Sequence, residues 1–303
     1  PASETPLTML ALMPLLEEAG VPKGLVNVLP SKKSGRLVDH MLHDPRVRVI
    51  SFTGSTEVGR KLLHSAADQV LKPAMELGGN TPLIVFEDAD IEKAVTGAML
   101  AKMRNLGEAC TAANRFYVHE AVSQEFTSKF CAAMAVLKMG DGLEDGIDVG
   151  PLVNADTRDK VAAFVADAVA KGAKLELGGT LPNGKGYYYP PTVLSNVPET
   201  ADCVHDEIFG PVAAIQSFTD EEDVIRRAND TEYGLVAYVF SENMKRAMQV
   251  CERLEYGMVG LNRGLVSDPA APFGGVKQSG LGREGGHEGM LEFMETQYIS
   301  AEW

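Results

Sequence analysis

The feature that most limits the fold is an alternation of short β-forming runs with helical patterns. Residues 25–29 and 47–52 are rich in Val, Leu and Ile, and a helical stretch over about 35–43 separates them. Strand, helix and strand at this spacing predict a βαβ unit, whose two strands lie parallel in one sheet. We therefore expect an α/β protein built on a parallel sheet.

The same alternation continues beyond residue 78 and predicts a second α/β unit with its own core. A chain of 303 residues, at about 150 residues per domain, agrees with two domains. An additional helix is expected over 6–19, with a kink or a late start because Pro14 lies inside it. Apolar spacing predicts further helices near 91–105, 121–137, 155–171, 219–229 and 243–254, and strands at 115–119, 212–218, 236–240 and 258–261.

Composition excludes several classes of function. The chain has 28 basic and 42 acidic residues, and a net charge of −14 disfavours nucleic acid because phosphate binding needs clustered Lys and Arg. No apolar stretch approaches the ~18 residues of a membrane span. Four scattered cysteines without a C-x-x-C pair, and six histidines outside any ligand spacing, predict neither a disulfide framework nor a metal site. We expect a cytoplasmic protein that acts on a small molecule.

A glycine-serine turn follows the β-forming run 47–52. Gly54 and Ser55 stand between that run and a helical pattern in which Val58, Leu62 and Ala66 recur every four residues. Free backbone N–H groups at a helix N-terminus suit a phosphate, so this turn is a candidate phosphate site. A tight βα turn that merely needs a small residue explains the pattern equally well.

Five motifs, in order and at family spacing, carry a resemblance to a known family. They are Phe52-Thr53-Gly54-Ser55, Met75 to Asn80, Asn105 to Cys110, Glu207 to Pro211, and Pro272 to Gly275. With these motifs the chain resembles the aldehyde dehydrogenase superfamily over essentially its whole length. The resemblance implies part of a Rossmann-type dinucleotide-binding domain over 1–78, a catalytic domain over 79–278, and a C-terminal return and oligomerisation segment over 279–303.

The resemblance also assigns the catalytic pair. Cys110 matches the nucleophile whose thiolate attacks the aldehyde carbonyl, and Glu76 matches the base that activates water for hydrolysis of the thioester. A partly apolar pocket around Glu76 is expected to raise the pKa of its carboxyl towards the working range. Glu108 stands where the family commonly has Gln, and we expect its carboxylate to face away from Cys110.

Cofactor contacts follow from the same resemblance. Gly54 and Ser55 would meet the pyrophosphate of the dinucleotide. Leu77 would touch the nicotinamide, Glu207 would bind its ribose hydroxyls, and Phe209 would pack nearby.

The choice between NADP and NAD depends on Ser3. NAD-preferring members often carry a glutamate at this position, and its carboxylate repels a 2′-phosphate, whereas a serine leaves room and a donor. We therefore expect NADP, and Glu4 beside Ser3 keeps NAD as the alternative.

Two further residues indicate an acidic substrate. Arg104 and Ser267 look like the residues with which succinate-semialdehyde dehydrogenases hold the distal carboxylate, because guanidinium binds carboxylate bidentately. With Phe273 at the substrate site, we expect NADP-dependent oxidation of succinate semialdehyde. Glutarate semialdehyde and simple aliphatic aldehydes are the alternatives, and the competing interpretation of Arg104 is a solvated or structurally paired side chain.

The resemblance further implies that a cofactor-binding lysine and the asparagine of the oxyanion hole precede the first residue of this chain. Losing one oxyanion donor costs about 10²–10³ in kcat, so we expect this polypeptide alone to be weakly active or inactive. A non-catalytic scaffold is the alternative of a different class. Residues 291–300 are expected to pair with a neighbouring subunit in a homodimer or homotetramer.

Overall fold

The structure is a computed structural model that describes all 303 residues. Packing divides the chain into two compact units, one formed by Pro1–Ile50 and Arg60–Pro73, the other by Ser51–Gly59 and Ala74–Trp303. The predicted domain boundaries at residues 78 and 278 stay a prediction.

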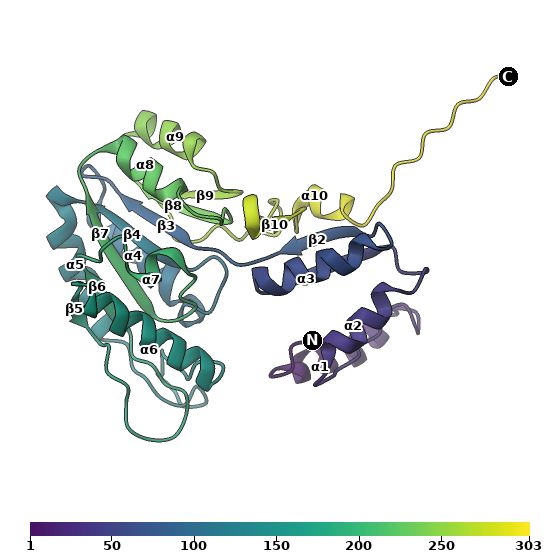
Figure 1. Ribbon diagram of the computed structural model, residues 1–303, viewed down its shortest axis with the longest axis horizontal. Helices are drawn as coiled ribbons and strands as arrows, with labels where there is room; N and C mark the ends of the chain where they lie inside the picture. The colour runs from purple at the N-terminus through teal and green to yellow at the C-terminus, as the bar shows by residue number, and fades with distance from the viewer. The chain divides into compact units, whose positions relative to one another are not determined.

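A seven-stranded sheet forms the centre of the larger unit (Figure 1). Its strand order is β5-β6-β7-β4-β3-β8-β9, and all neighbouring strands are parallel except β5 and β6. The predicted α/β class with a parallel sheet is confirmed. The strands are β3 (Thr81–Val85), β4 (Ala113–His119), β5 (Lys174–Leu177), β6 (Thr192–Ser195), β7 (Val212–Phe218), β8 (Val236–Phe240) and β9 (Met258–Leu261).

Helices cover both faces of this sheet, and the alternation of side chains along each strand decides which helices each residue meets. Leu83 and Val85 are buried against one helical layer, whereas Ile84 between them is buried against the other. The first layer consists of α4 (Ile91–Met103) and α5 (Glu120–Ala135); the second consists of α6 (Ala155–Ala170), α7 (Asp202–His205), α8 (Glu221–Asn229) and α9 (Met244–Arg253).

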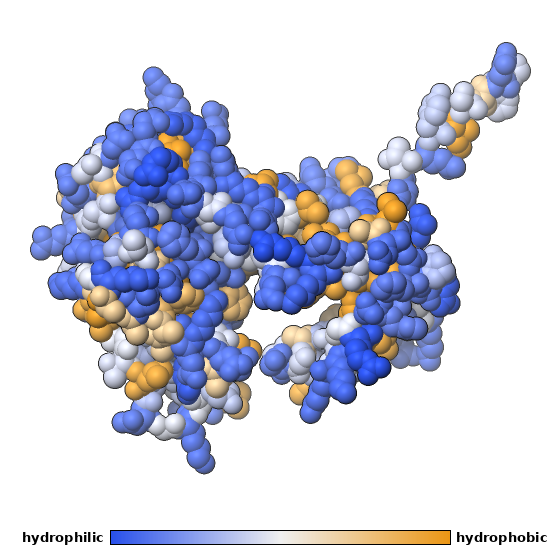
Figure 2. All heavy atoms as spheres, viewed as in Figure 1, coloured by the Kyte–Doolittle hydropathy of each residue, from blue (hydrophilic) through white to orange (hydrophobic).

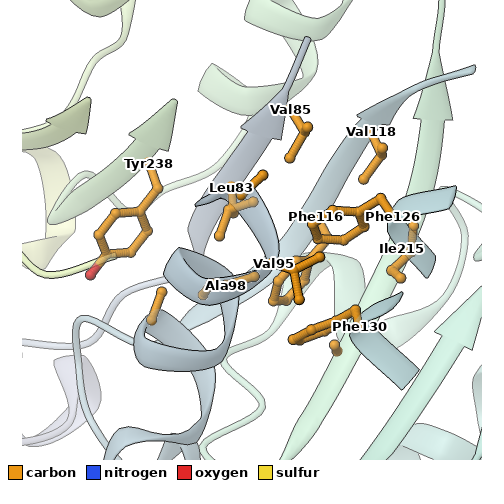
Figure 3. Close-up of a cluster of buried hydrophobic side chains, with 14 of the residues drawn as sticks. Leu83, Val85, Val95, Ala98, Phe116, Val118, Phe126, Phe130, Ile215 and Tyr238 are labelled. Carbon is orange, nitrogen blue, oxygen red and sulfur yellow. The ribbon is translucent and has the colours of Figure 1, made fainter. Parts of the chain in front are cut away.

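Phenylalanine rings fill the space between α5 and the sheet (Figure 3). The ring centroids of Phe116 and Phe130 lie 5.5 Å apart, as do those of Phe126 and Phe130. All three side chains are fully buried. Fully burying a phenylalanine contributes about 1.5–3 kcal/mol, so this cluster stabilises the layer that carries α4.

The predicted helices beyond residue 78 are confirmed, and polar side chains fix where they begin. Asp90 accepts a hydrogen bond from Lys93 N (3.1 Å) at the start of α4, and Asn154 accepts one from Thr157 N (2.9 Å) at the start of α6. Each such cap satisfies an N–H group that has no partner within the helix.

A second, smaller sheet has the order β1-β2-β10, with β1 at Val49–Thr53, β2 at Lys72–Glu76 and β10 at Gly280–Leu281. Gly280 lies opposite Glu76 in the antiparallel pair of β10 and β2. Helix α3 (Thr56–Ala67) connects β1 to β2, and β1, α3 and β2 contribute residues to both units.

The first unit differs from the sequence prediction at one point. Helix α1 (Pro6–Glu18) confirms the helix expected over 6–19, although it begins at Pro6 without the late start considered because of Pro14. Helix α2 (Ser34–Leu42) confirms the next one. The strand predicted over 25–29 is wrong, because Leu25 N donates to Pro22 O (3.2 Å) in a local turn instead of a ladder. The β-forming side chains in this run are not enough to form a strand when no partner strand pairs with it.

Strand β3 was not predicted, although it lies at the centre of the sheet. Its residues Thr81–Val85 are all buried, so they show no alternation of polar and apolar positions. Pro82 also argues against a central strand, since proline cannot donate to a ladder. The register of β3 on β4 shifts between Thr81 and Pro82, and this irregularity accommodates the proline.

The C-terminal region contains η2 (Lys277–Ser279) and α10 (Gly286–Leu291), followed by residues without helix or strand that extend away from α10 (Figure 1). Figure 2 shows apolar atoms exposed along this segment, which includes Phe293, Tyr298 and Ile299. The expected pairing with a neighbouring subunit stays a prediction. No helix in the structure has both the length and the apolar character needed to cross a membrane.

Replacing Phe130 with alanine should lower the free energy of unfolding by about 3–5 kcal/mol, because it removes a fully buried ring and leaves a cavity between α5 and the sheet. Urea unfolding followed by circular dichroism measures the change. Val136→Ala is the matched control, since Val136 is 73% exposed and should change stability by less than about 0.5 kcal/mol. Equal losses for both variants would contradict the assigned core.

Candidate active site

The site is organised around the turn that joins β2 to β3, residues 77–80. Gly79 passes so close to the next functional segment that a Cβ atom placed on it would lie 2.6 Å from Cys110 O. The Gly79 N–H also donates to Glu207 Oε1 (3.2 Å). Only glycine permits this approach of two backbones. The turn therefore brings Cys110 and Glu207 next to the strand that ends at Glu76.

Two hydroxyl groups hold the same turn from the other side. Ser279 Oγ donates to Gly78 O (2.7 Å) and accepts from Gly234 N (2.9 Å). Thr56 Oγ1 accepts from Gly78 N (3.3 Å) and donates to Gln278 O (3.2 Å). The first residue of α3 and the 277–279 segment thus fix the backbone at Gly78.

A left-handed turn delivers Cys110 to the site. Asn105 (φ 54°), Leu106 (φ 56°) and Gly107 (φ 75°), all within η1 (Arg104–Gly107), adopt positive φ in succession at the end of α4. Asn105 Nδ2 donates to Glu108 O (2.6 Å) and stabilises this conformation. Non-glycine residues in this region cost of order 1–2 kcal/mol each, a strain that the surrounding packing must offset.

Cys110 is partly buried and its surroundings are acidic. Burial raises the pKa of the thiol to about 11, and the nearby carboxylates of Glu207, Glu76 and Glu284 add to the increase. At neutral pH the group is therefore a thiol in this structure. Nucleophilic attack then requires that a neighbouring base take the proton.

Glu76 has the properties of such a base. Its side chain is buried, Oε2 has no hydrogen-bond partner, and a Cβ on Gly274 would lie 2.9 Å from Oε1. Burial, and to a smaller extent the charge of Glu284, raise the pKa of the carboxyl to about 8, and Arg283 opposes the increase. This agrees with the apolar pocket expected from the sequence. A carboxyl with a pKa near the operating pH is suited to accept and return a proton.

The residues expected to bind a dinucleotide meet at the start of α3. Gly54 and Ser55 directly precede the helix, and Ser55 Oγ accepts from Val58 N (3.4 Å). A Cβ on Gly59 would collide with the side chain of Leu77, so the first turn of α3 packs directly on Leu77. An exposed N-terminus of a twelve-residue helix fits a pyrophosphate, and its contact with Leu77 connects that end to the residue that follows Glu76.

Glu207 and Phe209 lie on the loop between α7 and β7, and both are half-buried. Burial raises the pKa of Glu207, and the N–H of Gly79 with the ammonium groups of Lys160 and Lys102 opposes that effect. Phe209 has a positive φ of 54°, an uncommon conformation that shapes the loop.

The residues expected to bind the substrate share fewer direct contacts than the residues around Cys110 and Glu76 do. Arg104 is exposed, and its charge, like that of Cys110, acts on the phenol of the buried Tyr238, which donates to Thr111 O (3.0 Å). Phe273 packs against the same core cluster as Cys110. Ser267 is half-buried and makes no hydrogen bond.

Three expectations concern residues outside this cluster. Ser3 is exposed in the first unit, ahead of α1. Glu108 accepts a hydrogen bond from Val153 N (3.0 Å) at Oε1 and is not among the carboxylates that raise the pKa of Cys110 most. That its carboxylate faces away from Cys110 stays a prediction. No group of three His, Cys, Asp or Glu side chains in the 303 residues is arranged to hold a metal ion.

Sequence reasoning missed several residues of the site. Arg263 lies near Tyr238 together with Arg104, and neither guanidinium has a hydrogen bond or an ion pair in the structure. Glu284 contributes to the electrostatics of both Cys110 and Glu76. The signal for Arg263 was its position four residues before Ser267, whereas Glu284 carried no signal beyond a Gly-rich segment.

Comparisons with known proteins show what the chain as a whole is similar to. The sequence pattern of the aldehyde dehydrogenase family matches residues 1–299. A succinate-semialdehyde dehydrogenase of Paenarthrobacter nicotinovorans is 54% identical and a glutarate-semialdehyde dehydrogenase of Pseudomonas putida is 47% identical, each over 99% of this chain. A crystal structure of an NADP-dependent enzyme from E. coli superposes with a TM-score of 0.97 at 46% identity and 99% coverage. The chain spans 66%, 62% and 62% of the lengths of these three proteins.

Replacing Glu76 with glutamine should speed the alkylation of Cys110 by iodoacetamide at about pH 9 by several-fold. Wild-type Glu76 is ionised at that pH and raises the pKa of the thiol, whereas at about pH 6 Glu76 is protonated and the two proteins should react alike. Peptide mass spectrometry measures the rate, with the Cys251 peptide as internal control. Identical profiles at both pH values would show that Glu76 does not act on Cys110.

Proposed function

Because the chain belongs to the aldehyde dehydrogenase family, we propose that the protein oxidises succinate semialdehyde to succinate with Cys110 as nucleophile and Glu76 as base. The observation that carries this proposal is the Gly79 turn, which packs against Cys110 and leads directly from Glu76. A nucleophile with a raised pKa beside a buried carboxyl of pKa about 8 is a working acid-base arrangement.

In the proposed reaction Sγ of Cys110 adds to the carbonyl carbon of the aldehyde and its proton passes to Glu76, directly or through one water. Loss of a hydride from the thiohemiacetal leaves a thioester on Cys110. Glu76 releases that proton to solvent and then takes one from water while the hydroxide attacks the thioester carbon, and the Cys110 thiolate leaves with the carboxylic acid as product. Glu76 thus serves two steps, which is the role its intermediate pKa allows.

We propose NADP as the hydride acceptor, with the nicotinamide ring supplying that chemistry when it is bound. Gly54 and Ser55 would hold its phosphates at the N-terminus of α3. Leu77 and Phe209 would contact the nicotinamide end, and Glu207 would accept from the ribose hydroxyls. The name of the E. coli structure, an NADP-dependent enzyme, supports this choice over NAD.

The acidic substrate is supported by two cations in a chain of net charge −14. Arg104 and Arg263 lie near the same phenol as Cys110, and neither has an acidic partner. We propose that Arg104, assisted by Ser267, binds the distal carboxylate of the substrate, with Phe273 as an apolar wall. Arg263 would add a second positive charge on the same side.

Glutarate semialdehyde, one methylene longer, is the second candidate substrate, and the relative from Pseudomonas putida favours it. One methylene changes discrimination by about 10–200-fold at most, so both substrates fit one clamp.

A scaffold without chemistry is disfavoured by the intact pair of Cys110 and Glu76. We further propose that the protein is a cytoplasmic homodimer or homotetramer.

Replacing Arg104 with alanine should raise KM for succinate semialdehyde by about 10–100-fold, because the variant loses a charge-assisted pair with the distal carboxylate. KM for butanal, which has no carboxylate, should change by less than about 2-fold. Steady-state reduction of NADP by the full-length protein at 340 nm measures both values. An equal effect on the two aldehydes would contradict the carboxylate clamp.

Replacing Ser3 with glutamate should weaken NADP binding by about 10-fold or more and leave NAD binding unchanged or stronger, since a carboxylate repels the 2′-phosphate. Fluorescence titration of the full-length protein with each dinucleotide measures the two dissociation constants. Ser3→Ala is the control, because it removes the hydroxyl without adding charge. An NADP affinity that is the same in all three proteins would exclude Ser3 from the selection.

A further inference from the structure

A fully buried lysine has no role in the reaction proposed above. Lys102 occupies the last turn of α4 with no exposed surface, and its Nζ donates to Asn114 Oδ1 (3.1 Å). An ammonium group has three donors, and burying its charge is expensive unless the surroundings compensate. A packing role alone is better filled by an apolar side chain of the same length.

The position of Lys102 connects the two segments that carry Cys110 and Glu207. A Cβ on Gly107 would lie 3.3 Å from Lys102 Cε and would overlap the carbonyl oxygen of Gly210. Gly107 ends the left-handed turn before Cys110, and Gly210 lies on the loop of Glu207. Lys102 therefore lies beneath the contact between these two segments.

The charged groups around this contact form a small set. Glu207 and Cys203 are the titratable groups that act on Lys102, from the loop before β7 and from α7. Two lysines act in turn on the Glu207 carboxylate, Lys102 from α4 and Lys160 from α6. Lys160 Nζ also donates a hydrogen bond to the backbone oxygen of Glu207 (2.9 Å). Gly79 N donates to the Glu207 carboxylate itself (3.2 Å). Lys160 thus binds the backbone of the loop, and Lys102 is the buried cation that acts on its carboxylate.

We propose that Lys102 is a positioning residue, whose buried ammonium keeps Glu207 ionised and its loop seated against the Cys110 segment, so that Glu207 can receive the cofactor ribose. The proposal rests on the function proposed above. Burial lowers the pKa of Lys102 to about 7, while Glu207 and Cys203 oppose the decrease. The positioning effect is accordingly present below about pH 7 and lost above it, as Lys102 becomes neutral.

The test replaces Lys102 with methionine, which keeps the length and apolar stem and removes the charge. In the full-length protein, fluorescence titration at about pH 6 should give a dissociation constant for NADP that is about 10-fold higher than in the wild type. At about pH 9, where wild-type Lys102 is neutral, the two proteins should bind NADP equally. Lys129→Met, at a half-buried lysine of α5 that pairs with Glu92 and Glu125, is the charge-matched control and should follow the wild type.

Thermal unfolding gives a readout that needs neither activity nor cofactor. The folded state holds Lys102 at a pKa of about 7, whereas an unfolded lysine titrates near 10.4, so the unfolded chain binds more protons between these values and stability rises with pH there. Lys102→Met should remove this component of the rise in Tm without lowering Tm at about pH 6. A variant with a lower Tm at every pH and the same slope as the wild type would show a packing role and overturn the proposal.

A double-mutant cycle with Glu207→Gln shows whether Lys102 acts through Glu207. If it does, Lys102→Met should change Tm at about pH 6 by a different amount in the Glu207→Gln background than in the wild type. Additive changes would overturn the proposal even if both variants bind NADP poorly. A wild-type protein that binds no dinucleotide would instead contradict the proposed function, and the cycle in Tm would still decide the role of Lys102.

Discussion

The close approach of Gly79 to the backbone of Cys110 is the constraint on which the rest of the site depends. It lets one short turn between β2 and β3 contact the segment of Cys110, donate a hydrogen bond to the carboxylate of Glu207 and extend the strand of Glu76. A side chain at this position would force the two segments apart, and a misplacement of about 1 Å can cost catalysis about 10²-fold. The hydroxyl groups of Ser279 and Thr56 matter because they hold the neighbouring residue, Gly78.

Burial and negative charge set the chemistry of this region. Glu76 and Cys110 both have raised pKa values because they are removed from water beside other carboxylates. Such a site favours protonated groups that exchange protons with one another. Each nearby cation acts on a different part of it. Arg283 opposes the rise in the pKa of Glu76, Lys102 and Lys160 face Glu207, and Arg104 has no acidic partner within the protein.

Much of this arrangement could be predicted from the sequence, and the exceptions have physical causes. The helices beyond residue 78 were predicted because each buries one apolar stripe, and Cys110 and Glu76 because they lie in motifs of fixed spacing. The run 25–29 was misassigned because β-forming residues do not pair without a neighbour, and β3 was missed because a strand buried on both faces shows no alternation. Lys102 gave no signal, since its burial arises only when α4 packs beneath two distant loops.

The central claim is that Cys110 carries the acyl intermediate and Glu76 releases it. The most direct measurement mixes the full-length Glu76→Gln variant with NADP and succinate semialdehyde, quenches with acid, and determines the mass of each cysteine-containing peptide. Without Glu76 the Cys110 thiol must lose its proton to solvent, so the account predicts that the Cys110 peptide gains the mass of one succinyl group more slowly than in the wild type. Once formed, this adduct persists in the variant, whereas in the wild type it is hydrolysed. An adduct on another cysteine, or none on Cys110 while NADPH is formed, would contradict it.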